Sequence, residues 1–454
     1  MGKKSKKNKK TDSIDSQALT NGLNGLRITD YQLDLKLLLK SFNVSVMKTY
    51  QIVPPRRIAN FQNSCFLNSL FQILFNCPFM NNFFNFTLTQ INSLFNERDI
   101  FEILDYSSVD YPCFSLIMKQ FIKYLASDLN KGILKNTYDL LPIQPGNQED
   151  CAEVLNLLLD RIHEELFVKE AEIEEIEPVD DDDTWFCAMK GKKVEVSRKT
   201  ELVGGNSSSP IGKFMSGSFV SSFSGDESNS LPKSVSEPFF ILPVDLNSAT
   251  SVQNALVSLA KKEILSDYSN KNVFKKQLLG SLPPVLIIQL KRFKFSPIDP
   301  TNKQSEWVAK KCLHQIKIEE NLEIRRSILS MQANAQSDDL KYTLNSIVFH
   351  LGNDIKKGHY TVAIRSQLSL MPNETPRFFF YADDDKRIEV RSKNMINLLL
   401  NSHYPLDPSK RGDQMFNQKA FSDTAEAESS QNPDIYQQPR TPYLLVYVQS
   451  KYFN

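Results

Sequence analysis

The residues that decide the fold of this chain are NSCFLNSLFQILFN, Asn63–Asn76. They are apolar nearly all round, and their main polar side chains fall on a narrow stripe at Asn68, Gln72 and Asn76. Apolar residues on almost every face of a helix are typical of a helix buried in the middle of a domain. The stretch therefore predicts a central helix around which the rest of the fold packs.

Cys65 stands at the first turn of this helix, with Asn63 or Ser64 as the expected N-cap. Orphan backbone N–H groups and the helix dipole favour negative charge there, so the position can stabilise a thiolate. A cysteine beside Phe and Leu is also typical of an inert core residue. A nucleophilic role requires a base, a residue that orients the base, and hydrogen-bond donors for an oxyanion.

The candidate bases are the five histidines His163, His314, His350, His359 and His403. We expect His163 on a helix surface, and His314 and His403 in exposed polar stretches. His350 and His359 remain, and they flank a loop with glycine near both ends, which is a design that can open and close over a site. A cysteine followed far downstream by a histidine and then by Asp or Asn is the chain order of papain-like peptidases.

The remaining pattern is helical first and β-rich afterwards. A second helix is predicted from Gln148 to about Phe167, with Asn147 as its N-cap. Nine acids lie within 170–183, which is too dense in one sign for a packed element and predicts a solvated connection. Beyond Trp185 short β-like runs alternate with Ser-, Asn- and Gly-rich loops, so the fold class is α+β.

Composition limits the class of protein. With 454 residues, 41% hydrophobic and 24% charged, the chain is neither collagen-like nor wholly disordered. No apolar run is long enough to cross a membrane and no secretory signal begins the sequence, so we expect a cytoplasmic, and also nuclear, protein without membrane contact. The six cysteines form no CxxC pair, which argues against a disulfide framework and a zinc site.

The charge is divided unevenly along the chain. Residues 1–10 hold six lysines and no acid, which leaves 48 basic against 53 acidic residues and a net charge of −5 for the remainder. We interpret residues 1–28 as a disordered Lys-rich tail and 29–54 as an N-terminal extension. Such a tail binds RNA or an acidic partner, or it merely aids solubility.

Five blocks carry a family resemblance. The segment Asn60–Gln72 resembles the cysteine box of the ubiquitin-specific proteases, and Gly358-His359-Tyr360, together with Tyr342 and His350-Leu351-Gly352 upstream, resembles their histidine box. Three more blocks agree in order, namely Gly146–Glu153, Leu282–Phe293 and Tyr443–Tyr447. Five ordered blocks across about 55–450 are a highly specific signal, whereas a lone Gly-His-Tyr would mean little.

The resemblance implies a papain-like cysteine peptidase core with thumb, palm and fingers subdomains, all within one catalytic domain at 55–450. The fingers would be an insertion at about 185–300. Family members often bind zinc there through two CxxC pairs, which this chain lacks. The expected fingers are therefore zinc-free, with neither metal nor cofactor, as in one branch of the family.

The resemblance also implies the catalytic residues. Cys65 would be the nucleophile and His359 the base. Asp384 would orient His359, with Asp383 as the alternative if the register shifts by one residue. Asn60 matches the side chain that helps the Cys65 backbone N–H hold the oxyanion, although it could also be a simple turn asparagine.

Substrate-binding residues follow in the same way. Asp150 and Glu153 match acids that bind the arginine-rich tail of ubiquitin in this family, and their spacing places them on one helix face. Alternatively Asp150 complements the helix dipole and Glu153 is solvated. Tyr360 would line the channel that admits the terminal Gly-Gly, or fill the core.

The implied function is a deubiquitinating thiol protease that hydrolyses the isopeptide bond after the C-terminal glycine of ubiquitin. The chain departs from the family at Gln62, where glycine is usual in the loop that presents Cys65, because glycine permits backbone conformations that other residues resist. This departure motivates one alternative, a catalytically weak or inactive ubiquitin-binding scaffold of the same fold.

Overall fold

The computed structural model of the protein describes residues 39, 42–43, 54–95, 99–129, 137–167, 185–190, 193–199, 209–225, 233–246, 249–265, 273–298, 307–331, 333, 335–354, 357–365, 379–385, 387–391 and 440–452. The predictions for the Lys-rich tail at 1–28, for most of the extension at 29–54, for the acidic connection at 170–183 and for His403 concern residues outside this set.

The N-terminal half is helical. Its helices are α3 (Cys65–Phe75), α4 (Pro78–Phe95), α5 (Ile100–Ser107), α6 (Pro112–Leu125), α7 (Thr137–Leu140) and α8 (Cys151–Glu165). Every residue of α3 is buried, which confirms the predicted central helix. Aromatic rings cluster at its end, where Phe75 stacks on Phe71 at 5.4 Å and meets Phe121 and Tyr124 at 5.3 and 5.1 Å between centroids.

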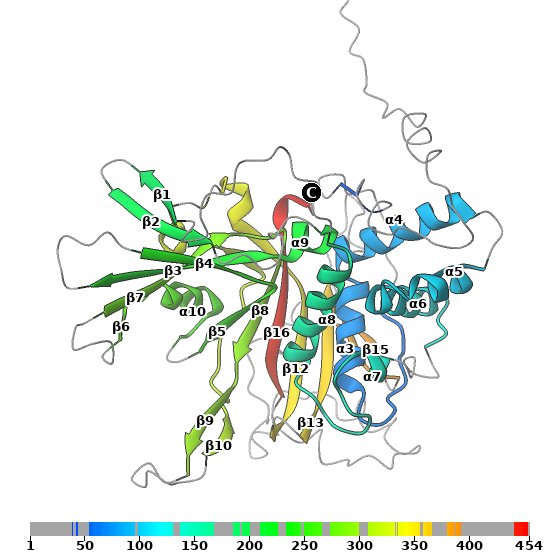
Figure 1. Ribbon diagram of the computed structural model, residues 1–454. Helices are drawn as coiled ribbons and strands as arrows, with labels where there is room; N and C mark the ends of the chain where they lie inside the picture. The colour runs from blue at the N-terminus through cyan, green and yellow to red at the C-terminus, as the bar shows by residue number, and fades with distance from the viewer. Residues whose placement is uncertain are drawn as a thin grey trace, which may run out of the picture.

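An eight-stranded sheet lies beside the helices (Figure 1). Its order is β15-β14-β13-β12-β16-β8-β5, and β11 pairs with β12. The strands are β5 (Ile241–Asp245), β8 (Val285–Lys291), β11 (Asn321–Glu323), β12 (Lys341–Asp354), β13 (Lys357–Arg365), β14 (Phe379–Asp383), β15 (Arg387–Arg391) and β16 (Arg440–Gln449). Helix α3 packs against β12 and β13, which brings the first turn of α3 close to the histidine box.

Both faces of this sheet are covered. Along β16, Leu444 and Val446 belong to the core that contains α3, whereas Leu445 and Tyr447 belong to a second core on the other side. Successive strand residues point to opposite faces, so a strand buried on both faces reads as the continuous apolar run seen here. The second core also takes in α10 (Val252–Leu259).

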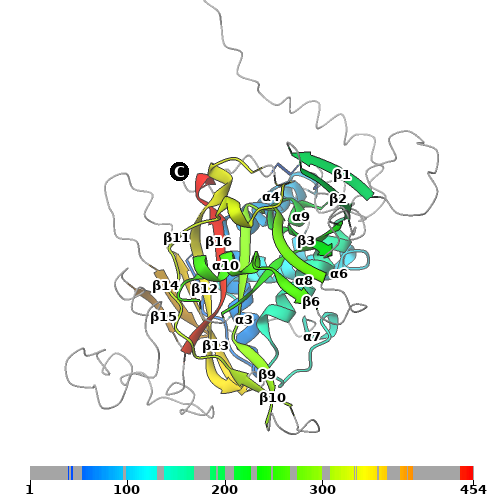
Figure 2. The same cartoon turned by 90° about the vertical axis from the view of Figure 1, so that its left-hand side faces the viewer.

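A separate six-stranded sheet has the order β1-β2-β4-β3-β7-β6 and extends away from the helices (Figure 1). Figure 2 views the molecule from the side of this sheet. Its strands are β1 (Trp185–Lys190), β2 (Lys193–Lys199), β3 (Gly217–Gly225), β4 (Lys233–Phe239), β6 (Glu263–Leu265) and β7 (Val273–Ser281). It falls inside the insertion predicted at about 185–300. That span is not a single unit, however, because β5 and β8 lie within it and belong to the eight-stranded sheet.

Shorter elements complete the described chain. They are α9 (Pro210–Met215), the hairpin of β9 (Phe293–Pro297) and β10 (Trp307–Lys311), and the 3₁₀ turns η1 (Arg326–Ile328), η2 (Asp338–Leu340) and η6 (Ser450–Tyr452). Within the described ranges, no helix has the length and apolar character required to cross a membrane.

Two local predictions are wrong. Helix α8 begins at Cys151 rather than Gln148, and its N-cap is Asp150, not Asn147, because the Asp150 Oδ1 atom accepts hydrogen bonds from the Ala152 and Glu153 backbone N–H groups at 2.7 and 3.4 Å. His163 is buried rather than exposed, since its Nδ1 lies 2.6 Å from the Ser209 hydroxyl at the start of α9.

Candidate active site

The loop before α3 presents Cys65 in an unusual backbone conformation. Gln62 and Asn63 have positive φ angles of 52° and 62°, in the left-handed region that non-glycine residues rarely adopt. The loop keeps this conformation because Gly146 donates its N–H to the Gln62 carbonyl at 3.1 Å and accepts from Asn63 Nδ2 at 2.7 Å. Gln62 thus takes the conformation that favours glycine, so the departure at this position leaves the loop intact.

Gln62→Gly should raise stability, because it relieves a left-handed conformation that costs a non-glycine residue about 1–2 kcal/mol. The greater freedom of glycine in the unfolded chain offsets about 0.4–1 kcal/mol of this gain. We expect a small net increase in the free energy of unfolding, measured by urea denaturation. Gln144→Gly is the matched control, since Gln144 lacks a positive φ and the same change there should destabilise.

His359 lies on β13 next to two consecutive carboxylates. Its Nε2 is 2.7 Å from Asp383 Oδ1, which is a hydrogen bond, and 3.8 Å from Asp384 Oδ2, which is an ion-pair distance without one. All three side chains are buried. The direct partner of His359 is therefore Asp383, the alternative register, and the expectation that Asp384 makes this contact is corrected.

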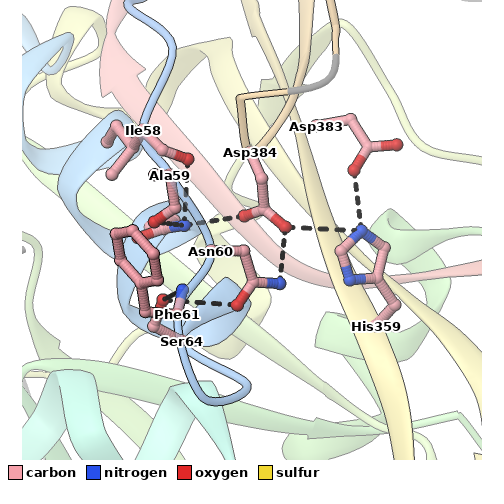
Figure 3. A network of polar contacts seen from close by, with 9 residues as sticks. Ile58, Ala59, Asn60, Phe61, Ser64, His359, Asp383 and Asp384 are labelled. Carbon is pink, nitrogen blue, oxygen red and sulfur yellow. Dashed lines mark hydrogen bonds and ion pairs between the residues drawn. The ribbon is translucent and has the colours of Figure 1, made fainter. Parts of the chain in front are cut away.

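Asp384 has other partners. Its Oδ2 accepts from Asn60 Nδ2 and its Oδ1 from Asn68 Nδ2, both at 2.8 Å (Figure 3). Its backbone carbonyl accepts from the Ile58 N–H at 3.3 Å. Asp384 therefore anchors the segment that enters α3. Asn60 is fixed by this contact, and its Oδ1 accepts from the Ser64 hydroxyl at 3.3 Å, so it is more than a simple turn residue.

Charge interactions at His359 favour an imidazolium. Burial alone would lower the pKa of His359, but Asp383 and Cys65, which lie close and hydrogen-bond the ring, raise this pKa well above its ordinary value. Burial also raises the pKa of Asp384 to about 6, against the opposing effect of His359. The arrangement can hold a proton on His359 between a carboxylate and the Cys65 sulfur.

The polar side chains of α3 hold the segment that leads into the helix. Besides Asp384, Asn68 Nδ2 donates to the carbonyls of Ile58 and Ala59 at 3.3 Å. Gln72 Nε2 donates to the Arg56 carbonyl. The stripe thus binds the extended segment that carries Asn60, and its spacing in the sequence was the signal for this function.

The predicted substrate-binding acids differ in exposure. Asp150 is half-buried, and both of its carboxylate oxygens already accept hydrogen bonds. Oδ1 accepts from the backbone N–H groups at the start of α8, and Oδ2 accepts from the Tyr443 hydroxyl. Gln289 Nε2 in turn donates to Tyr443 at 2.9 Å. Glu153 is exposed at the first turn of α8. Asp150 lies at the N-terminal end of α8, as the alternative of helix-dipole complementation requires, and Glu153 is solvated, whereas binding of a ubiquitin tail by either acid stays a prediction.

Tyr360 fills the core. It is fully buried and packs against His350 and Tyr443, with ring centroids 4.9 and 6.2 Å apart. The predicted channel-lining role does not fit this placement, and the alternative, that Tyr360 fills the core, does.

Burial, together with the charges of Lys311 and His359, lowers the pKa of His350 well below its ordinary value, which favours a neutral ring.

The group of His359, Asp383 and Asp384 has ligand atoms within 4.8 Å of one another, a spacing that could hold a metal ion. The hydrogen bonds present explain the cluster without one, because Asp383 accepts from His359 and both Asp384 oxygens accept from amides. A set of acceptors that is already matched to donors fits a catalytic hydrogen-bond network better than a metal centre.

Comparison with known proteins identifies the family. Residues 56–447 match the family described as "Ubiquitin carboxyl-terminal hydrolase". The probable ubiquitin carboxyl-terminal hydrolase 3 of Schizosaccharomyces pombe is 29% identical over 374 residues, which cover 72% of this chain and 69% of that protein. Ubiquitin carboxyl-terminal hydrolase 10 of Rattus norvegicus is 27% identical over 376 residues, covering 68% of this chain but only 43% of its own length.

Solved structures agree on the fold. A structure of the yeast SAGA DUB module with a mutant Sgf73 has a TM-score of 0.51 and 17% sequence identity, covering 91% of this chain and 73% of that chain. A SAGA DUB module bound to monoubiquitin has a TM-score of 0.50 at 17% identity, covering 91% and 74%. From the family match over most of its length, this chain belongs to the ubiquitin carboxyl-terminal hydrolase family of cysteine-type deubiquitinases.

Proposed function

We propose that Cys65, His359 and Asp383 carry out the reaction of this deubiquitinating thiol protease. His359, oriented by Asp383, takes the proton of Cys65, and the thiolate attacks the carbonyl of the last glycine of ubiquitin. The oxyanion accepts hydrogen bonds from the Cys65 N–H and from Asn60 Nδ2, which has a second hydrogen besides the one donated to Asp384. His359 then protonates the leaving lysine amine, and water hydrolyses the thioester.

The observation that carries this proposal is the buried hydrogen bond between His359 and Asp383, with the Cys65 thiol close enough to the same ring to raise its pKa. A raised pKa at His359 means that the ring accepts a proton readily when Cys65 loses one. An inert core cysteine, which is the alternative interpretation of the sequence, would not lie beside a histidine that is paired with a carboxylate. The 2.7 Å contact with Asp383 supports a fixed ring orientation, as a general base requires.

The test is covalent labelling by ubiquitin that carries an electrophile in place of its terminal carboxylate. We expect the wild-type protein to gain the mass of one ubiquitin, because the thiolate of Cys65 attacks the electrophile. Cys65→Ala should remain unlabelled, and Cys312→Ala, which removes a half-buried thiol directly after β10, should label like wild type. A wild-type protein that stays unlabelled while it binds ubiquitin would instead identify the inactive scaffold.

Ubiquitin is the partner that the family supports, and the finer contacts are proposals. Glu153 is exposed at the start of α8 and is proposed to bind the basic tail of ubiquitin. The half-buried Asp150 beside it, whose oxygens already accept from α8 and from Tyr443, would add to the negative charge there. The Lys-rich tail at 1–28 is proposed to bind RNA or an acidic partner in the cytoplasm or nucleus. Deleting residues 1–28 should abolish RNA co-purification, and unchanged RNA would remove this proposal.

A further inference from the structure

The loop at 146–150 lies between the two halves of the active site. On one side it contacts the loop that presents Cys65, where Gly146 and the pair Gln62 and Asn63 exchange two hydrogen bonds. Gly146 itself has a φ of 91°, which suits glycine. The first contact of this loop therefore sets the position of the nucleophile.

On the other side the same loop contacts the strand that carries the base. Gly358, directly before His359, donates its backbone N–H to Gln148 Oε1 at 2.6 Å. Because a backbone N–H can only donate, this bond also fixes which end of the Gln148 amide faces the strand. The bond joins residues 210 positions apart in the sequence.

Gly358 is also confined on its other flank. A Cβ atom there would lie 2.3 Å from His350 Nε2 and 2.4 Å from the Leu351 carbonyl oxygen, so no side chain fits. The His350 ring is held in turn by Lys311, whose Nζ lies 3.0 Å from Nδ1. The backbone before His359 is thus held between this ring and the Gln148 amide.

The end of this loop is fixed by hydrogen bonds to α8 and to the central sheet. Asp150 caps α8 through the Ala152 and Glu153 N–H groups and accepts from Tyr443 on β16. Gln148 is therefore two residues from a point attached to both α8 and the central sheet. A short segment that is fixed at both ends can keep a constant distance between the two segments that it contacts, which are the loop of Cys65 and the strand of His359.

We propose that Gln148 is a positioning residue, whose side-chain carbonyl holds Gly358, and with it His359, at the proper distance from Cys65. This inference rests on the proposed function, since it assigns a role in the same reaction. A displacement of reacting groups by about 1 Å can cost about 10²-fold in rate, so a single hydrogen bond that sets their spacing can have a large effect. Gln148 itself does not take part in bond making or breaking.

The first experiment compares steady-state cleavage of a fluorogenic ubiquitin substrate by wild type, Gln148→Ala and Gln148→Glu. We expect Gln148→Ala to lower kcat about 10- to 100-fold with KM changed by less than about two-fold, since spacing rather than substrate binding is lost. Gln148→Glu keeps an oxygen acceptor for the Gly358 N–H and should recover most of kcat. Gln144→Ala, which changes an exposed glutamine just before this loop, is the control expected to match wild type.

The second experiment needs no ubiquitin. The alkylation rate of Cys65 by iodoacetamide is measured against pH, and Cys65→Ala provides the background from the other thiols. At pH 6 the thiolate depends on a protonated His359 beside it, so Gln148→Ala should slow alkylation about ten-fold there. At pH 9 a thiol ionises without help, and the rates should agree within about two-fold.

These outcomes separate the two proposals. If wild type neither cleaves nor labels, the proposed function fails, whereas the alkylation profiles still test the positioning role. The positioning role is overturned if Gln148→Ala retains kcat and the low-pH alkylation rate of wild type. It is equally overturned if KM rises and Gln148→Glu is no better than alanine, because Gln148 would then contact the substrate through Nε2.

Discussion

His359→Ala is expected to lower kcat for ubiquitin cleavage by about 10⁴-fold or more, because removing the base from a nucleophile–base pair removes most of the chemical catalysis. The side chain is buried between Asp383 and Cys65, and no other described imidazole is placed to substitute for it. His350 is the nearest in sequence, but burial and the charge of Lys311 lower its pKa well below the ordinary value, which makes it a weak base, and its Nδ1 lies 3.0 Å from Lys311 Nζ. The measurement is kcat at saturating substrate.

The control for this variant is a histidine outside the site. His314 is half-buried, and its Nε2 contacts the Ala249 carbonyl at 2.7 Å, so His314→Ala should leave kcat close to that of wild type. Ubiquitin binding by His359→Ala, followed by calorimetry, should persist and show that the fold is retained. A variant at His359 that keeps a tenth of the wild-type kcat would contradict the base assignment.

Asp383→Ala and Asp384→Ala are both expected to lower kcat, but for different structural reasons. Losing Asp383 removes the hydrogen bond that orients His359, and comparable substitutions in proteases lower kcat about 10⁴-fold. Asp383→Asn keeps the shape of the side chain but loses the charge that raises the pKa of His359, so we expect a loss of about 10⁴-fold in kcat for this variant too. Asp383→Ala leaves one buried donor, on the His359 ring, without its acceptor, so we expect a smaller loss of stability than for Asp384→Ala, whose loss strands two donors. Pre-steady-state acylation would report the effect on the chemical step directly.

Asp384→Ala acts first on the structure around it. Asn60 and Asn68 would each lose an acceptor, and a buried donor left without one costs about 1–3 kcal/mol. We expect a clear loss of stability by urea denaturation. If Asn60 binds the oxyanion as proposed, its displacement should also lower kcat about 10²- to 10³-fold. A loss of kcat much larger than that of Asp383→Ala, without loss of stability, would restore Asp384 to the orienting role predicted from the sequence.

The one-residue difference between these acids has a physical cause. Consecutive strand residues normally point to opposite faces, so a pattern in a run of three aspartates cannot tell which one reaches a given histidine. Here β14 ends at Asp383, and Asp384 turns with a φ of 49° in the left-handed region. That turn directs both carboxylates inward, Asp383 toward His359 and Asp384 toward α3. No local sequence pattern predicts this arrangement.

Other misses have the same origin in contacts between distant segments. Asn147 and Asp150 are both good helix caps in sequence, and the structure selects Asp150, which Tyr443 also holds. His163 has polar neighbours along the chain, yet Ser209 at 2.6 Å gives it a buried partner. Burial of a polar side chain is settled by whether a partner reaches it, and a helix pattern does not contain that information.

By itself, the sequence determined that a buried helix begins at Cys65, that the chain is helical and then β-rich, and that its ordered blocks are those of a deubiquitinase family. It also predicted His359 as the base. These conclusions depend on periodicity, composition and ordered motifs, all of which are local properties of the chain. Only the tertiary structure decided that Asp383 contacts His359, that Asp384 anchors Asn60, and that Gln148 links the strand of His359 to the loop of Cys65. Each of those contacts joins segments far apart in sequence, so hydrogen-bond geometry in the folded core, rather than any pattern along the chain, selects the residue.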